Sequence, residues 1–417
     1  TIDGKGFVPE LLNSQLTGKI QELDINNYNY KNIDVSGDVS DKVFNGKLNI
    51  VDENIEMDFI GLIDYSNELI DFDFSTDIIK ANIGKLNLTL IENNSLSGKI
   101  TTKLRGSEFS NLIGDLSFKD FKYFSGDATY NFDELIAQSR INNDKRFYNI
   151  NSPDALSGII IGDLNFLQLP DILKNHVFAR YENFDSSDYL YSEISFNLNL
   201  KPKIASVLNS KMIIDENTFL RGSFNTDKSY EVVLTSPFLK LNDLSIDDIN
   251  LKINDNAGYL KLSKFQSELF DGDQLVILSS FSDDKTSFSL DFNSINGKNQ
   301  INFKHTVDLE NRSVFSFSKI SFDYNNNKWD LDWSDETNRN KLILSDNYKE
   351  LKPTRIKSKK QIIEFTYLNK EGQFDFESIF DNVGFSSIIP KPKNILYEGL
   401  VNGKISLKKY GEVYSRL

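Results

Sequence analysis

The sequence predicts an all-β fold: an elongated antiparallel β-groove of many short strands with a few short helices. Three observations predict this class. Apolar and polar residues alternate along many segments, Asn- and Asp-rich turn signals recur at short intervals, and helical spacing is scarce. No Pro- or Ser-rich linker divides the chain, so we expect one continuous repetitive segment over 1–417. Because the pattern is strand-like up to the last residues, we expect an internal fragment of a longer protein.

Alternation is the main strand signal. It is strictest at 194–200 (ISFNLNL) and recurs at 86–90 (LNLTL), 288–292 (FSLDF) and 329–333 (WDLDW). Successive side chains of a strand point to opposite faces, so the large apolar residues gather on one face and Asn, Asp, Ser and Lys on the other. This pattern is typical of half-buried antiparallel strands.

Short helical interruptions are expected near 166–179, 203–208 and 376–383. In the first of these segments, Ile172, Leu173 and His176 stand at helical spacing, and Pro170 suits a first helical turn. The histidine lies on the apolar side of the segment, so we interpret it as a packed residue.

The composition excludes several kinds of site. The chain has no Cys and two His, which excludes disulfides, thiolate metal sites and a three-His zinc centre. Its 61 acidic against 47 basic residues give a net charge of −14, which argues against nucleic-acid binding. We expect no metal and no cofactor.

Common catalytic motifs are incomplete. No Gly-Lys pair is followed by Ser or Thr, as a P-loop requires, and 384–388 (GFSSI) lacks the closing glycine of a nucleophile elbow. Asp330 opens a calcium-like loop, but Asp335 and Lys341 replace the required Gly and Glu. We expect no enzyme. A β-helical polysaccharide lyase or hydrolase, using paired carboxylates, is the enzymatic alternative.

The apolar stripes are the candidate binding residues. Either two sheets close them together as a dry sandwich, or they line an open apolar groove. The candidate lining residues are Leu48, Ile50, Met57, Phe59, Phe72, Phe74, Leu86, Leu88, Leu90, Leu116, Phe118, Ile194, Phe196, Leu198, Leu200, Leu251, Ile253, Phe288, Leu290, Phe292, Ile301, Phe303, Phe315 and Phe317. His305 extends the stripe of Ile301 and Phe303 and is interpreted as a packed residue.

A basic stripe is the main local charge feature. Arg355, Lys357 and Lys359 alternate and would share one face of a strand. They are candidates for contact with anionic lipid head groups. The alternative is an exposed edge strand that its lysines protect against pairing with other strands.

Several segments carry a family resemblance. The chain resembles the TamB (translocation and assembly module B) family of Bacteroidota, within the AsmA-like, bridge-like lipid-transfer superfamily. The resemblance is diffuse and covers most of the chain. It is carried by 28–37 (YNYKNIDVSG), 44–55 (FNGKLNIVDENI), 57–64, 72–78, 151–154, 218–222 and 399–405.

The resemblance implies a taco-shaped β-groove that spans the periplasm of a Gram-negative bacterium. It implies an inner-membrane anchor outside this chain, a BamA- or TamA-type barrel partner in the outer membrane, and phospholipid as ligand. The expected function is a lipid conduit that shields acyl chains and supports outer-membrane biogenesis. The alternative is a scaffold or chaperone for outer-membrane protein assembly or secretion through β-augmentation.

Overall fold

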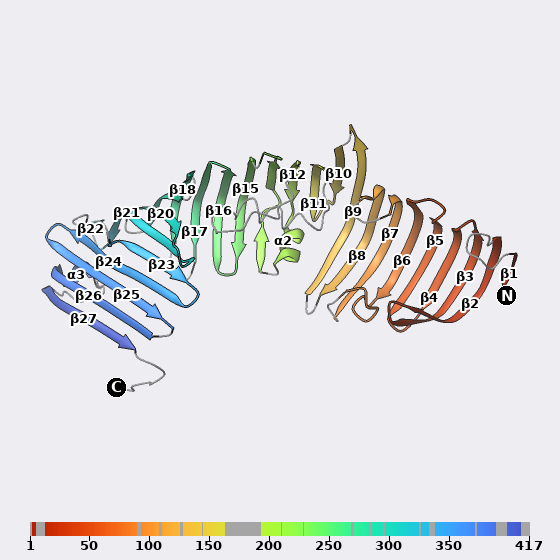
Figure 1. Cartoon of the computed structure of the whole chain (residues 1–417), viewed down its shortest axis with the longest axis horizontal. Coiled ribbons are helices and arrows are strands. Elements are labelled where there is room, and N and C mark those ends of the chain that lie inside the picture. Colours follow the sequence, from red (N-terminus) through yellow and green to blue (C-terminus); the bar gives the residue numbers. More distant parts are fainter. Residues whose placement is uncertain are drawn as a thin grey trace. The chain divides into compact units, whose positions relative to one another are not determined.

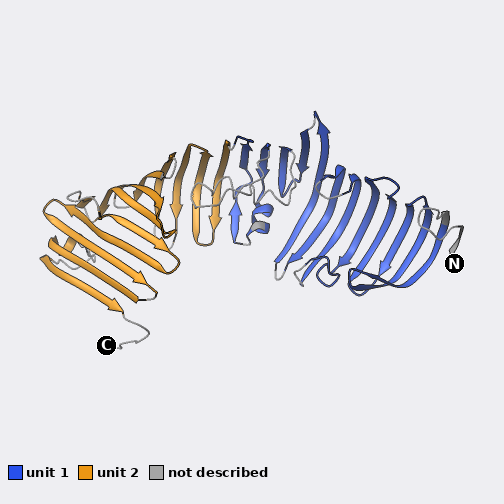
Figure 2. Ribbon diagram, viewed as in Figure 1, with its two compact units in different colours: residues 1–170, 191–227 blue, residues 171–190, 228–417 orange. Residues whose placement is uncertain are grey.

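The predicted all-β antiparallel class with few short helices is confirmed by a computed structural model (Figure 1). The structure describes residues 2–5, 13–89, 93–107, 111–125, 128–143, 145–162, 193–209, 211–227, 229–267, 271–282, 285–294, 297–324, 327–332, 338–371, 373–388 and 398–409. The chain forms two compact units (Figure 2). Unit 1 comprises Thr1–Pro170 and Tyr191–Asp227, and unit 2 comprises Asp171–Leu190 and Lys228–Leu417. The prediction of one continuous segment concerns how the units join, and it stays a prediction.

Unit 1 is an antiparallel meander in which strands β1 to β11 each pair with the next strand along the chain, and β12 pairs with β14. Its elements are β1 (Ile2–Lys5), β2 (Asn13–Ile25), β3 (Tyr28–Ser40), β4 (Val43–Val51), β5 (Ile55–Asp64), β6 (Ile70–Ala81), β7 (Asn94–Gly106), β8 (Ile113–Ser125), β9 (Ala128–Asn142), β10 (Lys145–Asn151), β11 (Leu156–Gly162), β12 (Ile194–Leu200), α2 (Pro202–Leu208), β13 (Met212–Ile214) and β14 (Thr218–Phe224).

Unit 2 continues the same pairing from β15 to β21 and from β24 to β27. Between them, β22 and β23 pair with different parts of β21 and both pair with β24, so the two short strands share one position in the sheet. The elements are β15 (Tyr230–Leu241), β16 (Leu244–Asn254), β17 (Ala257–Gln266), β18 (Asp271–Ser282), β19 (Lys285–Ser294), β20 (Gly297–Val307), β21 (Ser313–Tyr324), β22 (Asn327–Leu331), β23 (Lys341–Ser345), β24 (Tyr348–Ser358), β25 (Gln361–Lys370), β26 (Gln373–Gly384), α3 (Phe385–Ile388) and β27 (Leu400–Lys409).

Turn chemistry explains the short connections. Asn26 and Asn27 join β2 to β3, and Asp41 and Lys42 join β3 to β4, all four with positive φ. Two consecutive positive-φ residues form the turn whose twist matches an antiparallel hairpin, and Asn and Asp tolerate that backbone best. The Asn- and Asp-rich signals of the sequence therefore lie where the meander reverses.

The helix predictions have three outcomes. The helix near 203–208 is confirmed as α2, which has Pro202 in its first turn. The helix predicted at 376–383 is wrong, because these residues belong to β26 and pair with β25 on one side and β27 on the other. Phe374, Phe376 and Phe380 keep a period of two, and the short helix α3 begins only at residue 385. The prediction at 166–179 lies outside the described residues.

The strand predicted at 86–90 is also wrong in its described part, because residues 83–87 form turns. The amide of Leu86 donates to the carbonyl of Asn82, and that of Leu88 donates to the carbonyl of Ile83. The side chain of Asn87 donates to the main-chain carbonyls of Asn26 and Asn27, at 3.1 and 3.2 Å. The segment therefore leaves the sheet after β6 and is hydrogen-bonded to the β2–β3 turn.

Buried clusters hold the apolar side of each unit together. In unit 1, the turn residue Leu86 packs with Ile55 and Ala81, and Tyr28 and Tyr30 surround them. Unit 2 has two such clusters, which are built from buried residues of several adjacent strands. The first contains Ile249, Leu262 and Phe265, and the second contains Trp329, Ile356, Ile363 and Val383.

Candidate ligand-binding face

The strand register of unit 1 gathers the predicted lining residues on one side of the sheet. Residues opposite each other in a register point to the same face. One such row runs Phe74, Thr102, Leu116, Ala137, Ile150, Gly158, Leu198. A parallel row runs Leu48, Phe59, Thr76, Ile100, Phe118. Together with Ile50, Met57, Phe72, Ile194, Phe196 and Leu200, which occupy the same face, these rows form what we call the apolar face of unit 1.

Three predicted residues do not belong to this arrangement. Leu86 is buried, but in the turn cluster rather than on a strand. Leu88, in the same segment, is 56% exposed. Leu90 lies outside the described residues.

Unit 2 has an apolar face of its own. A row of paired residues runs Leu234, Leu251, Leu260, Ile277, Leu290, Ile301. The other predicted residues of unit 2 lie on the same face of β16, β19, β20 and β21: Ile253, Phe288, Phe292, Phe303, Phe315 and Phe317. The ring of Phe303 lies 4.9 Å from that of Phe288, 5.7 Å from that of Phe315 and 5.9 Å from that of Phe317. Such ring separations are favourable for aromatic packing.

His305 continues the apolar face of unit 2, as the sequence predicted. It is 8% exposed, lies opposite Thr286 and Phe315 in the register, and its ring centroid is 4.9 Å from that of Phe315. Burial lowers the pKa of His305, because the charged imidazolium loses hydration there. The residue therefore contributes a neutral ring to the face at neutral pH.

A cavity of about 360 Å³ opens on the apolar face of unit 1. It is at the lower end of the size range of small-molecule sites. Four predicted residues line it: Phe59, Phe72, Phe74 and Leu116. The remaining lining residues are Ile63, Ile100, Thr102, Leu104 and Leu112. Two of these, Ile100 and Leu104, were detectable in the sequence, because they are apolar residues at alternating positions along β7.

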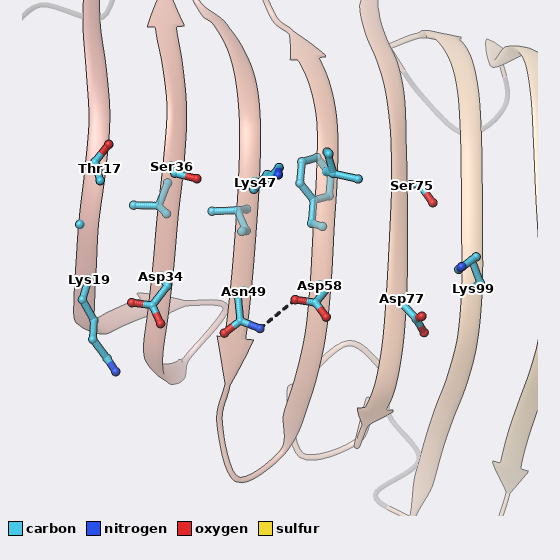
Figure 3. A pocket seen from close by; sticks show the side chains of 15 residues that line it. Thr17, Lys19, Asp34, Ser36, Lys47, Asn49, Asp58, Ser75, Asp77 and Lys99 are labelled. Carbon is cyan, nitrogen blue, oxygen red and sulfur yellow. Dashed lines mark hydrogen bonds between the residues drawn. The ribbon is translucent and has the colours of Figure 1, made fainter.

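The opposite face of unit 1 is polar and carries a wider concavity of about 820 Å³ (Figure 3). Across it, paired positions run Lys19, Asp34, Asn49, Asp58, Asp77, Lys99. The Asn49 amide donates to the Asp58 carboxylate at 2.8 Å. This row therefore carries hydrogen-bonding side chains and charges of both signs.

The basic stripe lies on the side of unit 2 opposite its apolar face. Arg355 pairs with Glu364 at 2.9 Å, and Lys357 pairs with Asp332 at 2.9 Å. Lys359 lies in the turn after β24, with positive φ. The edge-strand interpretation is wrong, because β24 pairs on both sides. Contact of these three residues with head groups stays a prediction.

Within the described residues, no group of three or more His, Asp or Glu side chains is placed to hold a metal ion. No described helix has the length and apolar composition needed to cross a bilayer. In comparisons with known proteins, no family model, curated protein or solved structure matches this chain.

Proposed function

We propose that this chain is a segment of a lipid conduit and that its apolar faces shield phospholipid acyl chains from water. The observation that carries the proposal is the unbroken row of paired positions on each apolar face. In unit 1 the row crosses seven successive strands, from Phe74 on β6 to Leu198 on β12, with apolar residues at most positions.

A face of this kind favours chain binding without a dominant contact. Each CH₂ group removed from water contributes about 0.8 kcal/mol, so an acyl chain is held by the sum of many small terms. Since most positions along the row are apolar, a bound chain exchanges one set of apolar contacts for another as it moves. The proposed role has no catalytic residue, and we do not expect the chain to be an enzyme.

We further propose the cellular setting that the sequence resemblance implies. The chain would belong to a TamB-type protein in the periplasm of a Gram-negative bacterium, anchored in the inner membrane through a segment outside this chain. Its partner would be a BamA-type barrel of the outer membrane. These assignments rest on the resemblance of segments such as 28–37 and 44–55.

A second candidate function is supported by strand β27. Among the described residues, β27 has one strand partner, β26. Leu400, Ile405 and Leu407 on β27 are exposed. An extended peptide that adds to the edge of a sheet by β-augmentation can contact exposed apolar side chains of this kind. This observation favours a scaffold or chaperone for outer-membrane proteins.

Photo-crosslinking in cells tests the first proposal against the second. A benzophenone amino acid replaces Phe303 in one strain and Lys304 in another, two adjacent residues on opposite faces of β20. We expect phospholipid adducts at position 303 and not at 304. Adducts at neither position, with no lipid in the purified protein, would overturn the conduit proposal. Crosslinks from β27 to an unfolded barrel protein would then support the scaffold function.

A further inference from the structure

The cavity on the apolar face of unit 1 contains one polar side chain. Thr102 lies on β7 in the middle of the lining, between Phe74 of β6 and Leu116 of β8 in the register. Ile100 and Leu104 flank it along the strand and also line the cavity. Every other lining side chain is aliphatic or aromatic.

The hydroxyl of Thr102 has no hydrogen-bond partner among the described residues. The residue is only 3% exposed. Thr76, on the same face, makes the contrast clear, since its hydroxyl donates to the Asp58 carbonyl at 2.8 Å. Buried polar groups in native proteins nearly always have a partner, so an unpartnered one calls for an explanation.

Water explains the Thr102 hydroxyl poorly. An ordered buried water needs two to four polar partners. The other side chains that line this cavity carry no polar group, and a cavity of about 360 Å³ is large enough for part of an organic molecule. A ligand that brings its own oxygen on an apolar chain satisfies both parts of the site. The Thr102 hydroxyl has almost no accessible surface in this rotamer, so it reaches a ligand in the cavity only after a 120° rotation about the Cα–Cβ bond, which carries it into the position of the methyl group or of the hydrogen.

We propose that this cavity is a discrete binding subsite for an aliphatic chain that carries a hydrogen-bonding oxygen, and that Thr102 is the residue that recognises the oxygen. The subsite rests on the proposed function, because it is one defined binding position on the apolar face. It would select chains that carry an oxygen over plain hydrocarbon chains, which uniform apolar contacts do not distinguish. The oxygen belongs either to an ester carbonyl, which accepts from Thr102, or to a chain hydroxyl, which also donates.

The test compares three probes of similar length on the whole chain: undecane, decanol and methyl nonanoate. Each probe displaces an environment-sensitive apolar dye, and the variants are Thr102→Val and Thr76→Val. Valine has nearly the shape of threonine but no hydroxyl, so the first variant removes the unpartnered group and the second removes a partnered one. Residue 76 does not line the cavity.

We expect Thr102→Val to weaken binding of decanol and methyl nonanoate by about 2- to 12-fold, the usual range for one neutral hydrogen bond, with undecane unchanged or tighter. Loss with decanol alone would assign the oxygen to a hydroxyl, and loss with both would include an ester carbonyl. Equal effects on all three probes, or the same pattern in Thr76→Val, would overturn the proposal.

A ligand-free measurement gives an independent check. Thr102→Val should keep or raise the melting temperature, because it removes a buried group without a partner, whereas Thr76→Val should lower it. An equal fall in both variants would show that the Thr102 hydroxyl has a partner and would overturn the subsite. Lipid adducts at position 303 together with no discrimination among the probes would refute the subsite and leave the conduit proposal standing.

Discussion

Phe59 and Ile60 are consecutive residues of β5, yet Phe59 is 7% exposed and Ile60 is 53% exposed. The ring of Phe59 lies 4.9 Å from that of Phe74 and 6.3 Å from that of Phe44, while Ile60, the next residue of β5, lies on the opposite face of the sheet. Two apolar neighbours thus occupy opposite environments because side chains alternate along a strand. Phe59 is buried because rings of the neighbouring strands cover it on its face of the sheet, whereas Ile60 stays exposed on the other face.

Replacing these two residues should have unequal effects on stability. Phe59→Ala removes a packed ring and should lower the free energy of unfolding by about 3 kcal/mol, whereas Ile60→Ala should change it by less than about 1 kcal/mol. Urea unfolding followed by far-UV circular dichroism measures both variants. Equal losses would contradict the assignment of residue 59 to the packed face.

A glycine on the apolar face of unit 1 should resist substitution. Gly61 has φ +149°, and a Cβ atom there would lie 2.4 Å from the Asp73 carbonyl oxygen and 2.4 Å from the Phe74 Cα. Gly61→Ala should therefore lower the free energy of unfolding by about 1–3 kcal/mol.

Gly399 provides the matched control for this substitution. It has φ +154°, and a Cβ atom there would meet nothing within 4 Å. Gly399→Ala shares the backbone strain but not the collision, so its loss of stability should be smaller. If the two variants lose the same amount in urea unfolding, backbone conformation rather than close strand approach determines the cost at Gly61.

The sequence predicted the faces well where the signal was local. Along β12, the alternation at 194–200 alone placed Ile194, Phe196, Leu198 and Leu200 on one face, as the register has them. The weaker alternation at 86–90 was misleading, because residues 83–87 form turns. The side chain of Asn87 donates hydrogen bonds to the main-chain carbonyls of Asn26 and Asn27, 61 and 60 residues earlier in the chain. These bonds hold the segment in its turn conformation, and no local sequence pattern contains them.

The candidate cavity was only partly predictable for the same reason. Phe59, Phe72, Phe74 and Leu116 were identified from their own strands. Thr102 was not, because a threonine among alternating residues looks like an ordinary strand residue. Its significance depends on the absence of a hydrogen-bond partner among the described residues, which requires the neighbouring strands β6 and β8 to be in place.

The turn after β6 should be an important stabilising element of unit 1. Leu86 has no exposed surface, so Leu86→Ala should lower the free energy of unfolding by about 2–5 kcal/mol. Leu88→Ala is the control, because that side chain is 56% exposed and should contribute little. Urea unfolding of both variants measures the difference. A larger effect at residue 88 would favour the strand that the sequence predicted there.

His305 should make the stability of unit 2 depend on pH. Its pKa is lowered by burial, so the unfolded chain binds a proton at this residue more readily than the folded chain does. The contribution of this residue to the free energy of unfolding should be fully present above the ordinary histidine pKa of about 6.5 and should fall as the pH drops from there toward the folded pKa.

The variant His305→Leu tests this, because it places an apolar side chain opposite Thr286 and Phe315 and removes the titrating group. Thermal unfolding of both proteins between about pH 7.5 and 5 isolates this residue, because the carboxylates and His176 are common to both and cancel in the difference. The wild-type protein should lose more stability than His305→Leu on acidification. Parallel profiles would mean that the imidazole is protonated as easily in the fold as in the unfolded chain, which contradicts its placement on the apolar face.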